Sequence, residues 1–155
     1  MGANGMVASA HTLATLAGVH VLLEGGNAFD AAVTVGSTLG VVEPHMSGIG
    51  GIGVALAYVA SEKRVRALDF SGRAPLASEP ALFTHETREV GPKAWLVPGT
   101  VAGWLTLHEK HGVMDRERLF APAIEYAHKG TPLSSLSSHV IDESAERVKL
   151  FDASA

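Results

Sequence analysis

The sequence predicts an α+β fold from the order of the patterns along its 155 residues. Two apolar helical segments come first, two short segments with strand-like alternation follow, and the remainder has the pattern of further helices. Two strands alone form only a marginally stable sheet. We therefore expect the sheet to be completed by residues outside this chain, so that the fold is incomplete here.

The first part of the chain predicts two helices joined by a short turn. Ser9 can cap a helix over residues 9–24, which carries a stripe of leucines and ends at a Gly-Gly pair. Asn27, with Asp30 three residues later, predicts a capping box for the next helix. That helix, residues 28–42, is apolar on nearly every face, so we expect it to be buried.

Residues 52–58 alternate bulky and small side chains, which predicts a strand with one bulky face and one small face. The small face would let a helix pack unusually close. Residues 64–70 predict a second strand, and the turn at residues 61–63 makes it the hairpin partner of the first. Residues 76–93 are expected to be mostly connection.

Three helices are expected in the second half. A Pro-Gly-Thr sequence opens residues 100–111, and Gly112 ends them. Pro122 is a favourable first helical residue, which predicts a helix from there to Lys129. A final amphipathic helix is expected to begin near Ser134.

Composition excludes several functional classes. A hydrophobic content of 46% indicates a folded chain, and a net charge of −4 gives no basic footprint for nucleic acid. Without cysteine there is no disulfide, thiolate metal site or Cys nucleophile. The apolar run at residues 28–42 is too short for a membrane span, and no signal-peptide pattern is visible. The cellular location is therefore left open between cytoplasm and periplasm.

Charge is unevenly distributed. Residues 1–60 contain no Lys or Arg, and Glu24, Asp30 and Glu43 are their only acids. Such a segment must be largely covered by other protein, and a chain this short has little with which to cover it. A larger body or a partner chain is therefore expected.

Residues 41–53 form a glycine-rich corner, with four glycines within six positions between a helical and a strand segment. Glycine is used where the backbone needs positive φ or close approach to another group. Known phosphate loops place the strand before the glycines and the helix after them, and here the order is reversed. Spacing therefore favours close packing over nucleotide binding.

Arg73 is the candidate for contact with substrate. It lies just beyond the second strand among small residues, and a guanidinium group suits a carboxylate. A salt bridge to Asp69 or simple solvent exposure is the competing interpretation, and spacing alone favours it. His108 and His111 share a helix face without a clear third ligand, so no metal site is predicted.

Several segments, taken together and in order, resemble the γ-glutamyltranspeptidase family. The matching segments are residues 6–11 (MVASAH), 25–33 (GGNAFDAAV), 42–51 (VEPHMSGIGG), 68–70 (LDF), 74–75 (AP), 97–103 (VPGTVAG) and 121–124 (APAI). Each is only moderately specific, but the ordered set is highly specific and spans almost the whole chain.

The resemblance implies an N-terminal-nucleophile (Ntn) hydrolase with stacked α, β, β and α layers. It implies a precursor that cuts itself once and a freed Thr that attacks γ-glutamyl amides such as glutathione without a cofactor. Residues 1–155 match only the N-terminal portion of the large subunit, as a single partial domain. The implied partners are the rest of that subunit and the small subunit bearing the nucleophilic Thr, so this chain alone is expected to be inactive and to hold no catalytic residue.

One departure concerns the substrate site. Typical transpeptidases follow the Asp-Phe pair directly with the Arg that holds the substrate α-carboxylate. Here Ser71 stands in that place and Arg73 comes two residues later. The pattern resembles a side branch of the family that includes acylases and other amidohydrolases. A non-γ-glutamyl amide as substrate, or a non-catalytic structural subunit, therefore remains an alternative.

Overall fold

The computed structural model describes residues 2–85, 87–91, 93–150 and 152. Its helices and strands follow in the order expected for a mixed α+β fold. They are α1 (Thr12–Leu23), α2 (Ala28–Val42), β1 (Gly53–Val59), β2 (Arg64–Phe70), α3 (Thr100–His111), α4 (Arg116–Lys129) and α5 (Ser135–Val148), with short 3₁₀ turns at Ala60–Glu62 and Pro80–Leu82.

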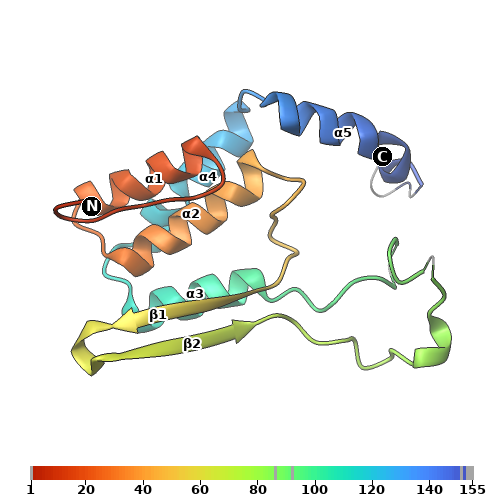
Figure 1. Ribbon diagram of the computed structural model, residues 1–155, viewed down its shortest axis with the longest axis horizontal. Helices are drawn as coiled ribbons and strands as arrows, with labels where there is room; N and C mark the ends of the chain where they lie inside the picture. Colours follow the sequence, from red (N-terminus) through yellow and green to blue (C-terminus); the bar gives the residue numbers. More distant parts are fainter. Residues whose placement is uncertain (1, 86, 92, 151, 153–155) are drawn as a thin grey trace.

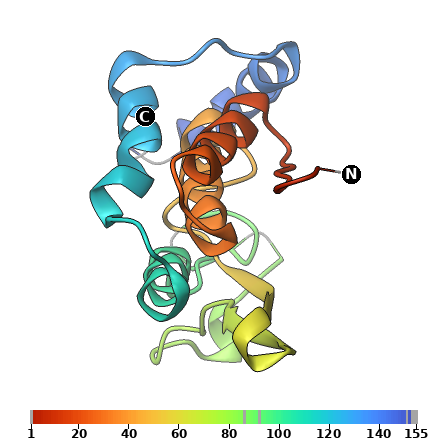
Figure 2. The same cartoon turned by 90° about the vertical axis from the view of Figure 1, so that its left-hand side faces the viewer.

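The elements form a helical layer over a two-stranded antiparallel sheet (Figure 1). Helix α2 packs against α1, α4 and α3, and α3 in turn lies on the β hairpin. Figure 2 shows the hairpin below these helices. Helix α5 extends away from the rest, and a long connection that includes the 3₁₀ turn at Pro80–Leu82 joins β2 to α3.

The predicted capping box is confirmed and joins two helices. The Asn27 side chain accepts hydrogen bonds from the amides of Phe29 and Asp30, and the Asp30 carboxylate accepts one from the amide of Asn27. Asp30 is fully buried and also accepts a hydrogen bond from the amide of Val113, beyond the end of α3. The start of α2 is thus tied to the end of α3.

Helix α2 is the centre of the core, as its apolar sequence predicts. Its buried Ala31 and Val33 pack in one cluster with Val21, Trp104 and Leu119 from three other helices. The expectation of burial on nearly every face holds for the three sides that contact helices. Some positions, such as Ala32, remain exposed.

Two predicted helix starts are wrong. Helix α1 begins at Thr12 with His11 as its N-cap, because the Ser9 hydroxyl donates to the His11 carbonyl instead of accepting from a first-turn amide. Helix α4 begins at Arg116, so Pro122 lies inside it. Interior proline costs about 3 kcal/mol, and complete burial of Leu119 in the turn before it offsets that cost.

The predicted hairpin is confirmed, and its two strands pair antiparallel. Gly53 pairs with Phe70 and Val59 with Arg64 at its two ends. The small face, with Ala55, lies toward α3, as the alternation predicts. The opposite face carries Val54, Leu56 and Tyr58, each more than 60% exposed.

Candidate substrate pocket at the end of the second strand

The loop that leaves β2 is held in one conformation by its neighbours. Gly72 has a φ of 79°, and a Cβ at this position would lie 2.6 Å from the Val97 carbonyl oxygen. The Arg73 carbonyl accepts a hydrogen bond from the Val97 amide at 2.9 Å. Residues 71–73 are therefore pinned against the segment that leads into α3.

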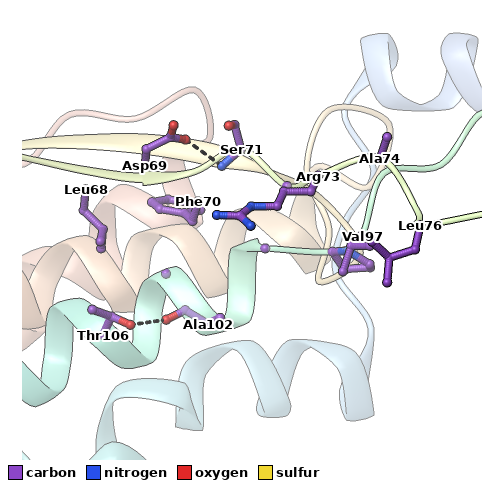
Figure 3. A pocket seen from close by; sticks show the side chains of 14 residues that line it. Leu68, Asp69, Phe70, Ser71, Arg73, Ala74, Leu76, Val97, Ala102 and Thr106 are labelled. Atoms are coloured by element: carbon purple, nitrogen blue, oxygen red, sulfur yellow. Dashed lines mark hydrogen bonds between the residues drawn. The ribbon is translucent and has the colours of Figure 1, made fainter. Parts of the chain in front are cut away.

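A pocket of about 590 Å³ opens between this loop, the end of β2 and the first turns of α3. Figure 3 shows Asp69, Ser71 and Arg73 on the strand and loop side and Ala102 and Thr106 on the helix side. The lining is mostly small or apolar, so its few polar groups determine what it can bind.

Arg73 supplies the cationic group of the pocket. Among the described residues its guanidinium makes no ion pair or hydrogen bond, and Figure 3 shows the side chain directed back toward Phe70. The salt bridge to Asp69 considered from the sequence is absent. The Asp69 carboxylate instead accepts a hydrogen bond from the Ser71 amide at 2.9 Å. The Arg73 charge is thus available to a carboxylate in the pocket.

Asp69 supplies the anionic group. Hydrogen bonds from the Ser71 side chain and then from its amide lower the pKa of Asp69, because they favour the ionised carboxylate. The Thr106 hydroxyl is already occupied, since it donates to the Ala102 carbonyl at 2.7 Å. Among the described residues that line the pocket, Arg73 on the loop therefore offers an unpaired guanidinium, while the charged Asp69 carboxylate lies at the end of β2 and bonds to Ser71.

Sequence reasoning found Arg73 but missed the helical side of the pocket. Ala102, Gly103 and Thr106 lie about thirty residues further along the chain, and nothing in the motif around Arg73 points to them. The available signal was the pair Gly99 and Gly103, four residues apart, which leaves one face of the helix start without side chains.

The glycine-rich corner is a packing corner, as its element order indicated. The Gly51 carbonyl accepts hydrogen bonds from the amides of Gly99 and Thr100, at 3.0 and 3.1 Å. The corner therefore anchors the start of α3. A second hollow of about 530 Å³ lies over it, lined in part by Ser47 and Thr100.

Two features are absent from the described ranges. No helix there is long and apolar enough to cross a membrane. No three His, Cys, Asp or Glu side chains there are grouped so that they could hold a metal ion.

Comparison with known proteins agrees with the motif pattern. Residues 14–155 match the family model for gamma-glutamyltranspeptidase. The chain is 38% identical to the glutathione hydrolase proenzyme of Bacillus subtilis over 156 aligned positions, covering 96% of this chain and 27% of that protein. The chain thus spans about a quarter of the length of that relative.

Solved structures give the same result. The gamma-glutamyltranspeptidase of Helicobacter pylori superposes with a TM-score of 0.95 at 37% identity, over 99% of this chain and 46% of that one. The cephalosporin acylase of Bacillus halodurans superposes with a TM-score of 0.85 at 34% identity, over 95% of this chain and 28% of that one. The chain therefore belongs to the gamma-glutamyltranspeptidase family, whose members are Ntn hydrolases.

Proposed function

We propose that residues 1–155 are the N-terminal portion of the large subunit of a self-processing amidase or acyltransferase that cleaves γ-glutamyl amides. Family membership supports the reaction class, and the relative from Bacillus subtilis is named a glutathione hydrolase proenzyme. The observation that carries the proposal is the unpaired Arg73 guanidinium in the pocket beyond β2.

In this proposal the chemistry is divided between this chain and its partners. A Thr outside residues 1–155, freed by self-cleavage, attacks the amide carbon, and its own α-amine serves as the base. The acyl group passes to water or to an acceptor amine, without a cofactor. This chain contributes to substrate binding, because Arg73 can bind the α-carboxylate of the substrate bidentately.

Substitution of Arg73 tests this role in the full-length processed protein. Arg73→Ala removes a charge-assisted contact worth about 1.5–3 kcal/mol, so KM for a carboxylate-bearing γ-glutamyl anilide should rise about 10- to 100-fold. Arg88→Ala is the matched control, because Arg88 is exposed outside the pocket and carries the same charge. Equal kinetics of the two variants would exclude Arg73 from substrate binding.

A related amidohydrolase or acylase without γ-glutamyl preference is the second candidate. Two observations favour this candidate. Ser71 stands where typical transpeptidases carry their carboxylate-binding Arg, and the chain matches the structure of a cephalosporin acylase. Rates of the full-length protein on a γ-glutamyl anilide and on a simple acyl amide separate the two. Preference for the acyl amide would replace the γ-glutamyl proposal.

A non-catalytic structural subunit is the third candidate, and self-processing separates it from both enzymes. The partners in our proposal are the rest of the large subunit and a small subunit that begins with the nucleophilic Thr. The full-length protein should then give two bands on a denaturing gel. A single band together with no amidase activity would favour the structural role.

A further inference from the structure

Phe70 ends β2 three residues before Arg73, and three glycines enclose it. A Cβ on Gly103 would lie 2.4 Å from Cγ of the Phe70 ring, and one on Gly53 would lie 2.6 Å from its Cε2. A Cβ on Gly99 would lie 2.2 Å from the Phe70 carbonyl oxygen. All three distances are too short for a side chain, so we call Gly53, Gly99 and Gly103 the glycine socket.

The glycine socket is assembled from separate segments that are fixed to one another. Gly53 is the first residue of β1 and the pairing partner of Phe70. Gly99 and Gly103 belong to the start of α3, and the Gly51 carbonyl holds that start by accepting the amides of Gly99 and Thr100. The glycine-rich corner therefore sets the distance between the start of β1 and the start of α3, which contact Phe70 from two sides.

The packing that fixes Phe70 also constrains Arg73, because the two residues are very close in the sequence. Only Ser71 and Gly72 lie between them, and consecutive Cα atoms are about 3.8 Å apart. Gly72 is itself confined, since a Cβ there would lie 2.9 Å from Cγ2 of Ile52. A shift of Phe70 must therefore move the loop that carries the guanidinium.

We propose that Phe70 is a positioning residue, which the glycine socket holds so that Arg73 stands at the right place for the substrate carboxylate. The proposal rests on the function proposed for Arg73. It gives the glycine-rich corner a role in substrate recognition without direct contact to substrate.

Gly103→Ala in the full-length processed protein tests the proposal. Alanine is the better helix former, so helix propensity alone would leave α3 sound. The added Cβ should displace Phe70, however, and raise KM for a carboxylate-bearing γ-glutamyl anilide about tenfold with kcat little changed. KM for the analogue without the α-carboxylate should stay the same.

Gly40→Ala is the matched control. Gly40 also lies within a helix, but a Cβ there would meet its nearest atom, Cα of Gly48, at an ordinary 3.5 Å. This variant should leave both KM values unchanged. An equal KM effect of Gly40→Ala and Gly103→Ala, or an equal effect of Gly103→Ala on both substrates, would overturn the proposal.

Phe70→Leu provides a second test should the Gly103 variant fail to fold. The smaller side chain fits the glycine socket loosely, so it should also raise KM selectively for the carboxylate-bearing substrate. A normal KM in Phe70→Leu would overturn the positioning role. The outcome for Arg73→Ala keeps the two proposals distinct. If KM rises in Arg73→Ala but is normal in both Phe70→Leu and Gly103→Ala, the substrate-binding role of Arg73 stands and the positioning role of Phe70 is excluded.

Discussion

Thr34 and Thr38 on α2 are fully buried, and their hydroxyl oxygens have no hydrogen-bond partner within the described part of the chain. A buried hydroxyl left unpaired costs about 1–3 kcal/mol. Valine has nearly the same shape without the polar group. The two threonines are therefore places where the core is less stable than its packing allows.

Thr38→Val should raise the free energy of unfolding of the full-length protein by about 1 kcal/mol, because it removes the unpaired hydroxyl. Denaturant unfolding measures this change. Thr15→Val is the matched control, since Thr15 lies on α1 and its hydroxyl is 2.7 Å from that of Ser9. The control should lower stability. A loss of stability in Thr38→Val would show that its hydroxyl does find a partner.

At the residue scale, the sequence predicted where Arg73 lies but not whether its guanidinium forms an ion pair. The position of Arg73 beyond a strand follows from local pattern. Its lack of an ion pair depends on Asp69, which lies on the opposite sheet face from Phe70 and bonds to Ser71. Within the glycine socket, the distances from Phe70 to Gly99 and Gly103 also depend on a segment about thirty residues away, which no local pattern relates to Phe70.

At the scale of elements, Asp30 contributes more than a helix cap. It accepts the Asn27 amide and the Val113 amide, and Asn27 Nδ2 donates to the His111 carbonyl at 2.6 Å. The buried Asp30 and the half-buried Asn27 therefore join the start of α2 to the end of α3. The same contact explains Gly112, where a Cβ would lie 2.7 Å from Asp30 Oδ1.

Asp30→Ala should lower the free energy of unfolding by about 2–4 kcal/mol, because a cap is lost and the Val113 amide loses its acceptor. Thermal and denaturant unfolding of the full-length protein would measure it. Asp115→Ala is the matched control: Asp115 is the N-cap of α4, is exposed and makes no side-chain capping bond. It should change stability by less than about 0.5 kcal/mol. Similar values for both variants would contradict the role of Asp30 in joining α2 to α3.

The end of the hairpin carries a pH-sensitive cluster. Arg66 and Arg64 donate to Glu62 Oε2 at 2.6 and 2.8 Å, and they lower the pKa of Glu62 from 4.5 to about 2. A depressed carboxylate pKa adds stability that is fully present above the unfolded pKa. That stability is lost as pH falls through the folded value.

Glu62→Gln should therefore unfold at a lower temperature than the unsubstituted protein above about pH 4.5, and the difference should shrink as pH approaches about 2. Melting temperatures of the full-length protein across that range provide the measurement. Among single variants, Arg66→Ala should raise the pKa of Glu62 more than Arg64→Ala does, because Arg66 is the larger cause of the shift. A difference in melting temperature that does not depend on pH would contradict this assignment.

Element types could be predicted from sequence, and two boundaries could not. The alternation at residues 52–58 and the Asn-Asp spacing before α2 are local signals, and both were correct. Pro122 gave a misleading local signal. Burial of Leu119 against α2 is a tertiary effect, and it lets α4 begin at Arg116, six residues before the proline. Ser9 misled for a local reason, because its hydroxyl donates to the His11 carbonyl two residues later.

At the scale of the whole molecule, the described residues cover only one side of the sheet. Helix α3 lies on the small face of the hairpin, while the bulky face carries exposed apolar side chains. An Ntn fold stacks a second sheet against the first, and the Bacillus subtilis relative is several times longer than this chain. The scarcity of charge in residues 1–60 agrees with an extensive covered surface.

Leu56, which is 75% exposed at the centre of the bulky face, tests whether that face is covered in the full-length protein. Leu56→Ser should lower the free energy of unfolding of the full-length protein by about 2–4 kcal/mol, because a buried leucine side chain is lost. In residues 1–155 alone the same change should reduce self-association, because it interrupts an exposed apolar face. Denaturant unfolding and light scattering measure the two effects.

Leu23→Ser is the control, because Leu23 is equally exposed, at 78%, but lies at the end of α1 away from the sheet. A covered sheet face requires Leu56→Ser to cost the full-length protein clearly more than Leu23→Ser does. If both cost the same, the bulky face stays in solvent there. The two effects expected for Leu56→Ser follow from one cause, since the apolar surface that would make residues 1–155 associate when isolated is the surface that would stabilise the complete fold once covered.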